Sequence, residues 1–368
     1  MPNNNPYLPI FEFTRGKIVE SIHYGAVAVV NSEGKLLAWY GDPQAVTFLR
    51  SSAKPFQATP FIEHGGQTAY NLTLREIALI CASHSGTDEH VRVVQEIQRK
   101  TSVKESDLLC GTHPIAHKPT KEAMRERREA ITPNRHNCSG KHTGMLAYTR
   151  LKGLSVDPIS NLPYTDPTHP VQQEILHTFA EMCGLLPEQV AIGIDGCSVP
   201  TFGIPLFNCA LGYARLCDPS VLSEHRASAC RTITTAMTSN PDMVGGPDSF
   251  DTHLMETGQG KILCKGGAEG YQALGLLPDG NKNADRGIGI AIKISDGDLE
   301  GRSSSPKEYL GHVRPAVVLE VLRQLGVIGT TEFQKLSDYG PIFPLHNWRK
   351  LEVGQGRPCF TLNLNNHP

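Results

Sequence analysis

The stretch Arg50-Ser51-Ser52-Ala53-Lys54-Pro55-Phe56-Gln57 places a hydroxyl and an amine three residues apart at the expected start of a helix. Residues three apart lie on one face of a helix, so we expect Ser51 to cap the helix and the Lys54 amine to reach its oxygen. Pro55 then falls in the first turn, where its missing N–H costs little. A lysine kept neutral by burial or by a second cation can take the proton of a serine, which is otherwise a poor nucleophile.

This Ser-x-x-Lys spacing is a weak signal by itself. It also occurs at Ser32 with Lys35 and at Ser304 with Lys307. The alternative is that Ser51 is an ordinary N-cap and Lys54 a solvated residue of the first turn. Other features of the chain have to decide between a nucleophile and a cap.

Length and charge limit the class of protein. The 368 residues, 39% of them hydrophobic, suffice for a sizeable core and allow one large domain or two packed subdomains. The net charge of -2, with no basic run, argues against nucleic acid or an anionic membrane as a partner and favours a small neutral or zwitterionic substrate. The N-terminus lacks a cationic start followed by an apolar segment, and no later apolar run approaches membrane-spanning length, so we expect a cytoplasmic protein.

Periodicity and turn residues predict alternating strands and helices. A hairpin is expected around the turn Ser32-Glu33-Gly34. Thr73-Leu74-Arg75-Glu76 is a capping box before a buried helix that leads to Ser83, and Asp251 stands at the start of another capped helix. Prolines 158, 163, 167 and 170 mark an irregular connection, so a subdomain seam is expected near 153–170. Further helices are expected over residues 121–130, 171–183, 206–216, 220–238 and 315–325, and strands over 190–194, 261–265 and 287–295.

Three other segments carry groups suited to a site. His136-Asn137-Cys138-Ser139-Gly140-Lys141-His142-Thr143-Gly144 is dense in polar and sulfur groups ahead of an expected helix, but it lacks the upstream glycine of a phosphate-binding loop. Asp195-Gly196-Cys197 puts a carboxylate and a thiol just past a strand. Lys265 runs into Gly266-Gly267-Ala268-Glu269-Gly270, where glycines let another group approach the backbone closely.

Five of these motifs occur together in one order: Arg50-Ser51-Ser52-Ala53-Lys54-Pro55, Ser83-His84-Ser85-Gly86, Cys138-Ser139-Gly140-Lys141-His142, Ile194-Asp195-Gly196-Cys197 and Lys265-Gly266-Gly267-Ala268-Glu269-Gly270. In this combination, which spans most of the chain, the sequence resembles the class 3, or rhizobial-type, L-asparaginases. The resemblance implies an α+β fold like that of the serine β-lactamases and transpeptidases, with an antiparallel sheet flanked by helices. It also implies a single asparaginase domain over residues 1–368 and a homodimer.

The resemblance assigns roles to residues of this chain. Ser51 is implied as the nucleophile with Lys54 as its base, and Ser83 with Lys265 as a second Ser-Lys pair that only tertiary folding can bring together. Arg50, His142 and Asp195 are implied to border the substrate. Which of the two serines attacks stays open.

The resemblance also implies a zinc ion held by Cys138, Lys141 and Cys197. Lysine is an unusual zinc ligand because it must first lose its proton. Three protein ligands leave the fourth tetrahedral position to water or substrate, as in an open site. The alternatives are that Cys138 and Cys197 are plain buried thiols and that Asp195 only forms a turn.

The reaction implied is hydrolysis of L-asparagine to aspartate and ammonia through a serine acyl-enzyme. A serine glutaminase or a β-lactamase-like hydrolase is one alternative, because these enzymes share a Ser-Lys nucleophile. The pocket length that selects the substrate is not visible in the sequence. A non-catalytic sensor module that stays acylated is a second alternative. A zinc amidohydrolase, in which the metal generates hydroxide, is a third.

Overall fold

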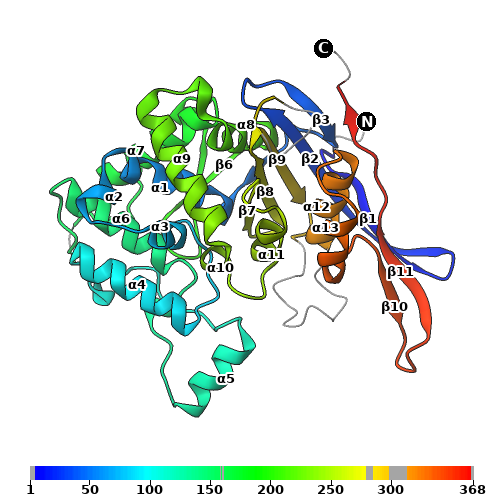
Figure 1. Ribbon diagram of the computed structural model, residues 1–368, viewed down its shortest axis with the longest axis horizontal. Helices are drawn as coiled ribbons and strands as arrows, with labels where there is room; N and C mark the ends of the chain where they lie inside the picture. The colour runs from blue at the N-terminus through cyan, green and yellow to red at the C-terminus, as the bar shows by residue number, and fades with distance from the viewer. Residues whose placement is uncertain (1–4, 158, 160, 279–284, 298–312, 366–368) are drawn as a thin grey trace.

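An antiparallel sheet forms the centre of this computed structural model, which describes residues 5–157, 159, 161–278, 285–297 and 313–365 (Figure 1). Its main path runs β10-β11-β1-β2-β9-β8-β7, and β3 and β12 extend it beside β2. Two neighbouring strands of this path come from opposite ends of the chain, since Phe11 on β1 pairs with Pro358 on β11. The strands are β1 Leu8–Arg15, β2 Ile18–Asn31, β3 Leu36–Tyr40, β7 Ile262–Gly267, β8 Tyr271–Leu276, β9 Ile288–Ile294, β10 Phe343–His346, β11 Glu352–Pro358 and β12 Asn363–Leu364.

Helices cover both faces of this sheet. Helix α8 (Leu206–Cys217) packs across β9, β2 and β8, and it comes so close that a Cβ on Gly289 would lie 1.7 Å from the Ala210 carbonyl oxygen. On the other face, α12 (Val313–Gln324) contacts β1, β8, β9 and β11, and α11 (Phe250–Thr257) packs against β7. The predicted α+β fold, an antiparallel sheet flanked by helices, is confirmed.

A group of helices beside the sheet carries most of the candidate site (Figure 1). A small antiparallel sheet in the order β4-β6-β5 lies next to it, formed by β4 Val46–Phe48, β5 Ala191–Ile194 and β6 Pro200–Pro205. The helices are α1 Lys54–Glu63, α2 Gly66–Ala69, α3 Leu74–Ile80, α4 Asp88–Thr101, α5 Lys118–Glu126, α6 Ser139–Leu151, α7 Pro170–Met182, α9 Glu224–Ser239 and α10 Pro241–Val244. The short helix α13, Thr330–Lys335, lies instead beside α12 (Figure 1).

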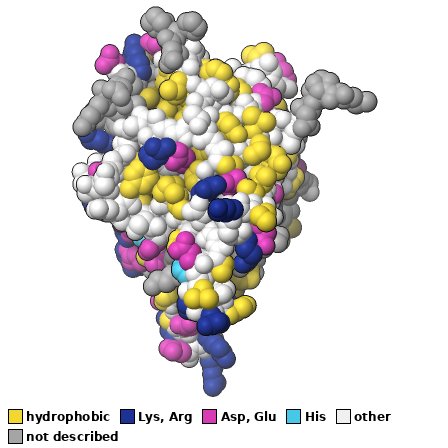
Figure 2. All heavy atoms as spheres, turned by 90° about the vertical axis from the view of Figure 1, so that its right-hand side faces the viewer, with side chains coloured by type: hydrophobic (Ala, Val, Ile, Leu, Met, Phe, Trp, Pro, Cys, Tyr) yellow, Lys and Arg dark blue, Asp and Glu magenta, His cyan; other side chains and the backbone are white. Residues whose placement is uncertain are grey.

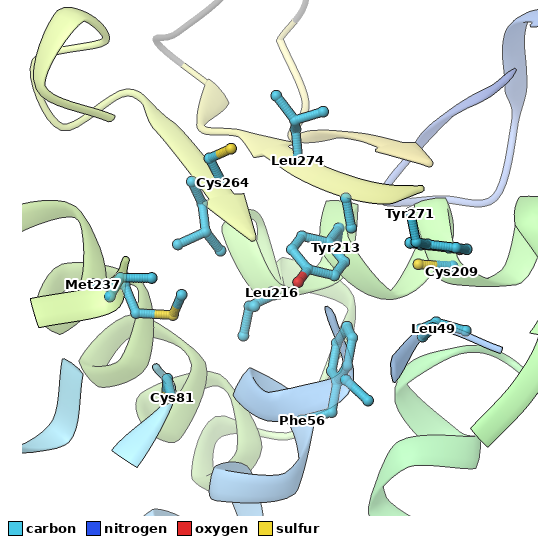
Figure 3. Close-up of a cluster of buried hydrophobic side chains, with 14 of the residues drawn as sticks. Leu49, Phe56, Cys81, Cys209, Tyr213, Leu216, Met237, Cys264, Tyr271 and Leu274 are labelled. Atoms are coloured by element: carbon cyan, nitrogen blue, oxygen red, sulfur yellow. The ribbon is translucent and has the colours of Figure 1, made fainter. Parts of the chain in front are cut away.

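The core lies where α8 meets the sheet and α1 (Figure 3). Tyr213 of α8 and Phe56 of α1 are fully buried, with ring centroids 5.3 Å apart in an edge-to-face arrangement. The Tyr213 hydroxyl also donates a hydrogen bond of 2.8 Å to the main-chain carbonyl of Ser52. The core thus holds the Ser51–Lys54 segment in place.

Most predicted elements are present with shifted ends. The Thr73 capping box is confirmed, because its side chain accepts from the Glu76 N–H while the Glu76 carboxylate accepts from the Thr73 N–H. The helix expected at Asp251 is α11, but Ser249 is its N-cap. No helix or strand occupies the described residues of the expected seam between α6 and α7. Of the two other Ser-x-x-Lys pairs, Ser304 with Lys307 lies outside the described residues.

The surface gives two further findings. Figure 2 looks onto the side of the molecule that carries β10, β11 and the β1–β2 hairpin, where hydrophobic side chains gather in several patches. Large exposed apolar side chains on these elements include Ile18, Ile22 and Trp348, the last in the β10–β11 turn. Among the described helices, none is both long and apolar enough to cross a membrane.

Candidate active site

Ser51 lies in a single turn of 3-10 helix, Arg50–Ala53, that leads into α1. Arg50 adopts a left-handed conformation, with φ of 49°. The prediction that Ser51 caps the helix is wrong: its main-chain carbonyl accepts the Lys54 N–H, and Ala53 occupies the N-cap position without a side-chain cap. A backbone group has therefore taken the place of a side-chain cap, which leaves the half-buried Ser51 hydroxyl free for other chemistry.

Lys54 is buried and points toward Ser83. Its Nζ donates to the Ala82 carbonyl at 2.6 Å, to Ser83 Oγ at 2.8 Å and to the Asn137 carbonyl at 3.4 Å. Within the described part of the chain, the predicted hydrogen bond to Ser51 is replaced by the one to Ser83. Carbonyls only accept, whereas a hydroxyl also donates, so a neutral Lys54 amine can accept the Ser83 proton while both carbonyls stay satisfied.

A second lysine comes from β7. Lys265 is buried, and its Nζ donates to the Gly266 carbonyl at 2.8 Å. The pKa of Lys265 is lowered to about 8: burial is the largest cause, Asp251 opposes the shift, and the nearby Lys54 charge adds to it. The Lys54 charge acts on Lys265, and the lysine that is hydrogen-bonded to Ser83 is Lys54 and not Lys265.

The end of β7 fits closely against the Ser51 turn. Ser52 Oγ donates 2.8 Å to the Lys265 carbonyl, and a Cβ on Gly267 would lie 2.3 Å from the Leu49 carbonyl oxygen. Only glycine allows this approach, which confirms the reason given for the glycine-rich run after Lys265. The serine turn and the strand with the second lysine are thereby held together.

Arg50 and Asp195 form an ion pair beside the serine. Arg50 Nε donates 2.6 Å to Asp195 Oδ1, and the two side chains are 29% and 10% exposed. Asp195 also accepts a hydrogen bond from the Gly196 N–H, in a turn that follows β5. Asp195 therefore forms the turn and also pairs with Arg50, and the pair places one cation and one anion next to the serine in the chain.

The three predicted zinc ligands converge. Lys141 Nζ donates 2.9 Å to Cys197 Sγ, and a hydrogen bond joins the two cysteine side chains. That bond lowers the pKa of Cys138 and raises the pKa of Cys197, because it stabilises the Cys138 thiolate and the Cys197 thiol. All three residues are buried. Two sulfurs and an amine within contact of one another match the donors that zinc takes once the lysine has lost its proton.

Two observations bear on metal binding at this cluster. Burial alone would lower the pKa of Lys141, but the charges of Cys138, Cys197 and Asp195 raise it above its ordinary value, so zinc has to displace a proton there. Among the described residues, no group of three or more His, Cys, Asp or Glu side chains forms a metal site. The cluster has only two such ligands, so it depends on Lys141.

His142 is fully buried beside this cluster. Its Nδ1 is 2.7 Å from the Tyr164 hydroxyl, and its Nε2 has no hydrogen-bond partner among the described residues. Burial, then the Lys141 charge, holds the pKa of His142 well below its usual value, so the ring is neutral. A neutral ring with one unused nitrogen is suited to a polar ligand.

Sequence reasoning did not assign several supporting contacts. His84 Nε2 is 2.9 Å from Ser139 Oγ, which ties the Ser83 segment to the Cys138 segment. Tyr164, from the irregular connection, orients His142. The Asp251 carboxylate lies beside Lys265. These contacts join residues far apart in the chain, and the single available signal was that His84 and Ser139 each lie inside a quoted motif.

The chain is similar to one family of known proteins and to several solved structures. The profile of the family described as L-asparaginase II matches residues 11–358. A comparison with curated proteins found no match. Among solved structures, a probable glutaminase from Bacillus subtilis complexed with 6-diazo-5-oxo-L-norleucine is 12% identical, with a TM-score of 0.35 over 82% of this chain and 84% of that chain. A Bacillus glutaminase studied in 4.3 M NaCl is 11% identical, with a TM-score of 0.35 over 82% and 91% of the two chains.

Likenesses as distant as these two structures carry no argument about the substrate. The family profile covers nearly the whole chain and agrees with the resemblance seen in the five motifs. The chain therefore belongs to the L-asparaginase II family.

Proposed function

We propose that this amidohydrolase cleaves the side-chain amide of L-asparagine through an ester on Ser51. The observation that carries the proposal is a half-buried serine hydroxyl at the start of α1 beside two buried, converging lysines, Lys54 and Lys265. Burial and a neighbouring positive charge favour the neutral form of an amine, as the lowered pKa of Lys265 shows, and a lysine base has to be neutral.

Two covalent steps make up the reaction. Ser51 Oγ attacks the amide carbon, its proton passes to Lys54, and ammonia leaves with a proton from the lysine and serine network. Water then attacks the ester carbon, aspartate is released and the Ser51 hydroxyl is restored. Ser83, held 2.8 Å from Lys54 Nζ, supplies the hydroxyl through which that proton can move between lysine and substrate.

The Arg50–Asp195 pair is suited to the backbone groups of an amino acid. A guanidinium binds a carboxylate, and a carboxylate binds an ammonium. The neutral His142 ring, with Nε2 unused, supplies a further polar contact. These three side chains support a substrate that is a free amino acid.

We also propose that Cys138, Lys141 and Cys197 hold zinc. Bound zinc would supply a fixed positive charge next to the substrate groups that Asp195 and Arg50 border. The serine already provides the nucleophile, so the chain's own residues suffice for the covalent steps. Asp195, with Oδ2 3.8 Å from Cys197 Sγ, would link the metal site to the substrate pocket.

A homodimer in the cytoplasm is proposed on the family resemblance. The exposed apolar side chains of the β1–β2 hairpin and the β10–β11 turn support an association surface, since exposed apolar patches mark such sites. Sedimentation of the purified protein should then give twice the 40.1 kDa mass of one chain.

Two assays test the proposal: ammonia release from asparagine and from glutamine, and ring opening of a β-lactam. We expect turnover of asparagine, with Ser51→Ala and Lys54→Ala each losing at least about 1,000-fold in kcat and the double variant being little worse, because the groups act as one unit. Ser32→Ala is the matched control: it belongs to another Ser-x-x-Lys pair, and its hydroxyl donates to Asp218, so it should lower stability and leave kcat unchanged. Full activity in folded Ser51→Ala would refute the assignment.

A further inference from the structure

Asp251, in the first turn of α11, is a buried carboxylate with no role in the assignments above. Its Oδ2 accepts the Gly266 N–H at 2.6 Å. Its Oδ1 accepts from the Gln272 amide at 3.0 Å and from the Cys264 thiol at 3.4 Å. The carboxylate therefore joins α11 to β7 and β8 at the point where β7 presents Lys265.

The same carboxylate faces the second lysine. Asp251 Oδ2 lies 3.9 Å from Lys265 Nζ, and the two side chains are 11% and 1% exposed. We propose that Asp251 is a positioning residue that fixes Lys265 at the end of β7 and sets the charge balance of its amine. The inference rests on the proposed function only in giving Lys265 a part in the reaction.

The surroundings of Lys265 contain more positive than negative charge. The titratable groups that act on it are the Asp251 carboxylate, two cations and two thiols: Lys54 of α1, Arg314 of α12, Cys264 of β7 and Cys81 after α3. Burial raises the pKa of Cys81 to about 12 and holds that of Cys264 well above its usual value, so both thiols are neutral. Asp251 is thus the anion that keeps Lys265 from losing its proton well below neutral pH.

Asp251 is itself charged. Burial alone would raise its pKa, but Lys265, Arg314 and the Gly266 and Gln272 hydrogen bonds outweigh burial and hold the pKa below its usual value. A neutral side chain could accept the Gly266 N–H equally well. Only a carboxylate also supplies the charge, which separates an electrostatic role from a purely structural one.

The chain contains a matched control. Asp218 is as buried as Asp251, at 7% against 8% exposure, and its Oδ2 accepts the Gly287 N–H at 3.1 Å beside a strand of the same sheet. Asp218 also accepts from the Ser32 hydroxyl and from Ser220, so it holds backbone without an active-site lysine. Asp218→Asn should therefore reproduce the loss of packing and hydrogen bonding without the loss of charge near Lys265.

The experiment is a pH titration of the full chain, labelled with ¹³Cε-lysine and followed by NMR, with the Lys265 signal assigned from its loss in Lys265→Arg. Asp251→Asn should lower the Lys265 midpoint by about 1–3 pH units, the range typical of one opposite charge at this distance. Asp218→Asn and the charge-conserving Asp251→Glu should leave it near the wild-type value. Asp251→Ser, which is also neutral, serves in place of Asp251→Asn if that variant does not fold.

An unchanged Lys265 midpoint in a folded, neutral Asp251 variant would overturn the inference, even if activity is lost. The pH profile of kcat, measured on the same proteins, tests the proposed function separately. A lowered midpoint with a shifted profile supports both claims. A lowered midpoint with an unshifted profile supports the role of Asp251 and contradicts a part for Lys265 in the reaction.

Discussion

At the scale of single residues, two buried amines define the site, and they predict a pH dependence. Lys265 has a pKa lowered to about 8 by burial and by Lys54. The Lys265 amine has to be neutral to take part in proton transfer with Lys54, and at pH 7 only about a tenth of a group with that pKa is neutral. The rate should therefore rise with pH through the region near 8 and level off above it. A pH profile of kcat checks this, and a steady fall from pH 7 to 9 in folded protein would contradict a lysine base.

Residue identities at the site follow from the sequence better than residue contacts do. Lys54 bonds to Ser83 and its charge acts on Lys265, while the catalytic roles that the family resemblance implied for these residues and for Ser51 stay predictions. The bond from Lys54 to Ser83, in place of Ser51, depends on how α1 packs against the segment after α3, and no local pattern encodes that. Asp251 was visible only as the start of a helix, because its partners on β7 and β8 come from later in the chain.

At the scale of elements, the first turn of α6 and the turn after β5 bring the proposed metal ligands together, and this arrangement predicts a separation of roles. Cys138→Ala removes one sulfur, so bound zinc should fall to near zero per chain, KM should rise and the melting temperature should drop, while kcat largely survives. Metal analysis, zinc titration and thermal melts measure these effects. Cys230→Ala is the control, because this thiol is fully buried and contributes only to packing. Equal zinc content in both variants would mean that Cys138 is a plain buried thiol.

The contact between α8 and β9 predicts a large effect from one methyl group. A Cβ on Gly289 would lie 1.7 Å from the Ala210 carbonyl oxygen. The backbone fixes the positions of both atoms, so no side-chain rotation can relieve the clash. Gly289→Ala should therefore cost roughly 3 kcal/mol of unfolding free energy, the upper part of the range for overpacked cores. The control is Gly196→Ala, because a Cβ there would lie 3.9 Å from the Arg50 guanidinium, an ordinary contact distance. Gly260→Ala is less informative, because the φ of 83° at that position adds backbone strain. Denaturant melts with similar midpoints for both variants would contradict this account of the packing.

At the scale of the whole molecule, the family resemblance predicted the class of fold, and local patterns did not predict the order of strands. The hairpin of β2 and β3 was visible because its two strands are adjacent and share a turn. The pairing of β1 with β11 joins the two ends of the chain, and β8, β10 and β11 were not predicted. Closing such distant pairs depends on the shape of the entire core, which α8, Phe56 and Tyr213 help to form (Figure 3).

The central claim is that the Ser51 hydroxyl is the nucleophile that forms the covalent intermediate, and covalent labelling tests this most directly. An asparagine-length diazo ketone, in which diazomethyl replaces the amide nitrogen, leaves a stable bond on the attacking oxygen. Incubated with the full chain and followed by intact mass and peptide mapping, it should add one group per chain on Ser51, abolish activity in step with labelling, and leave Ser51→Ala unmodified. A label on Ser83, or equal labelling of Ser51→Ala, would contradict the account.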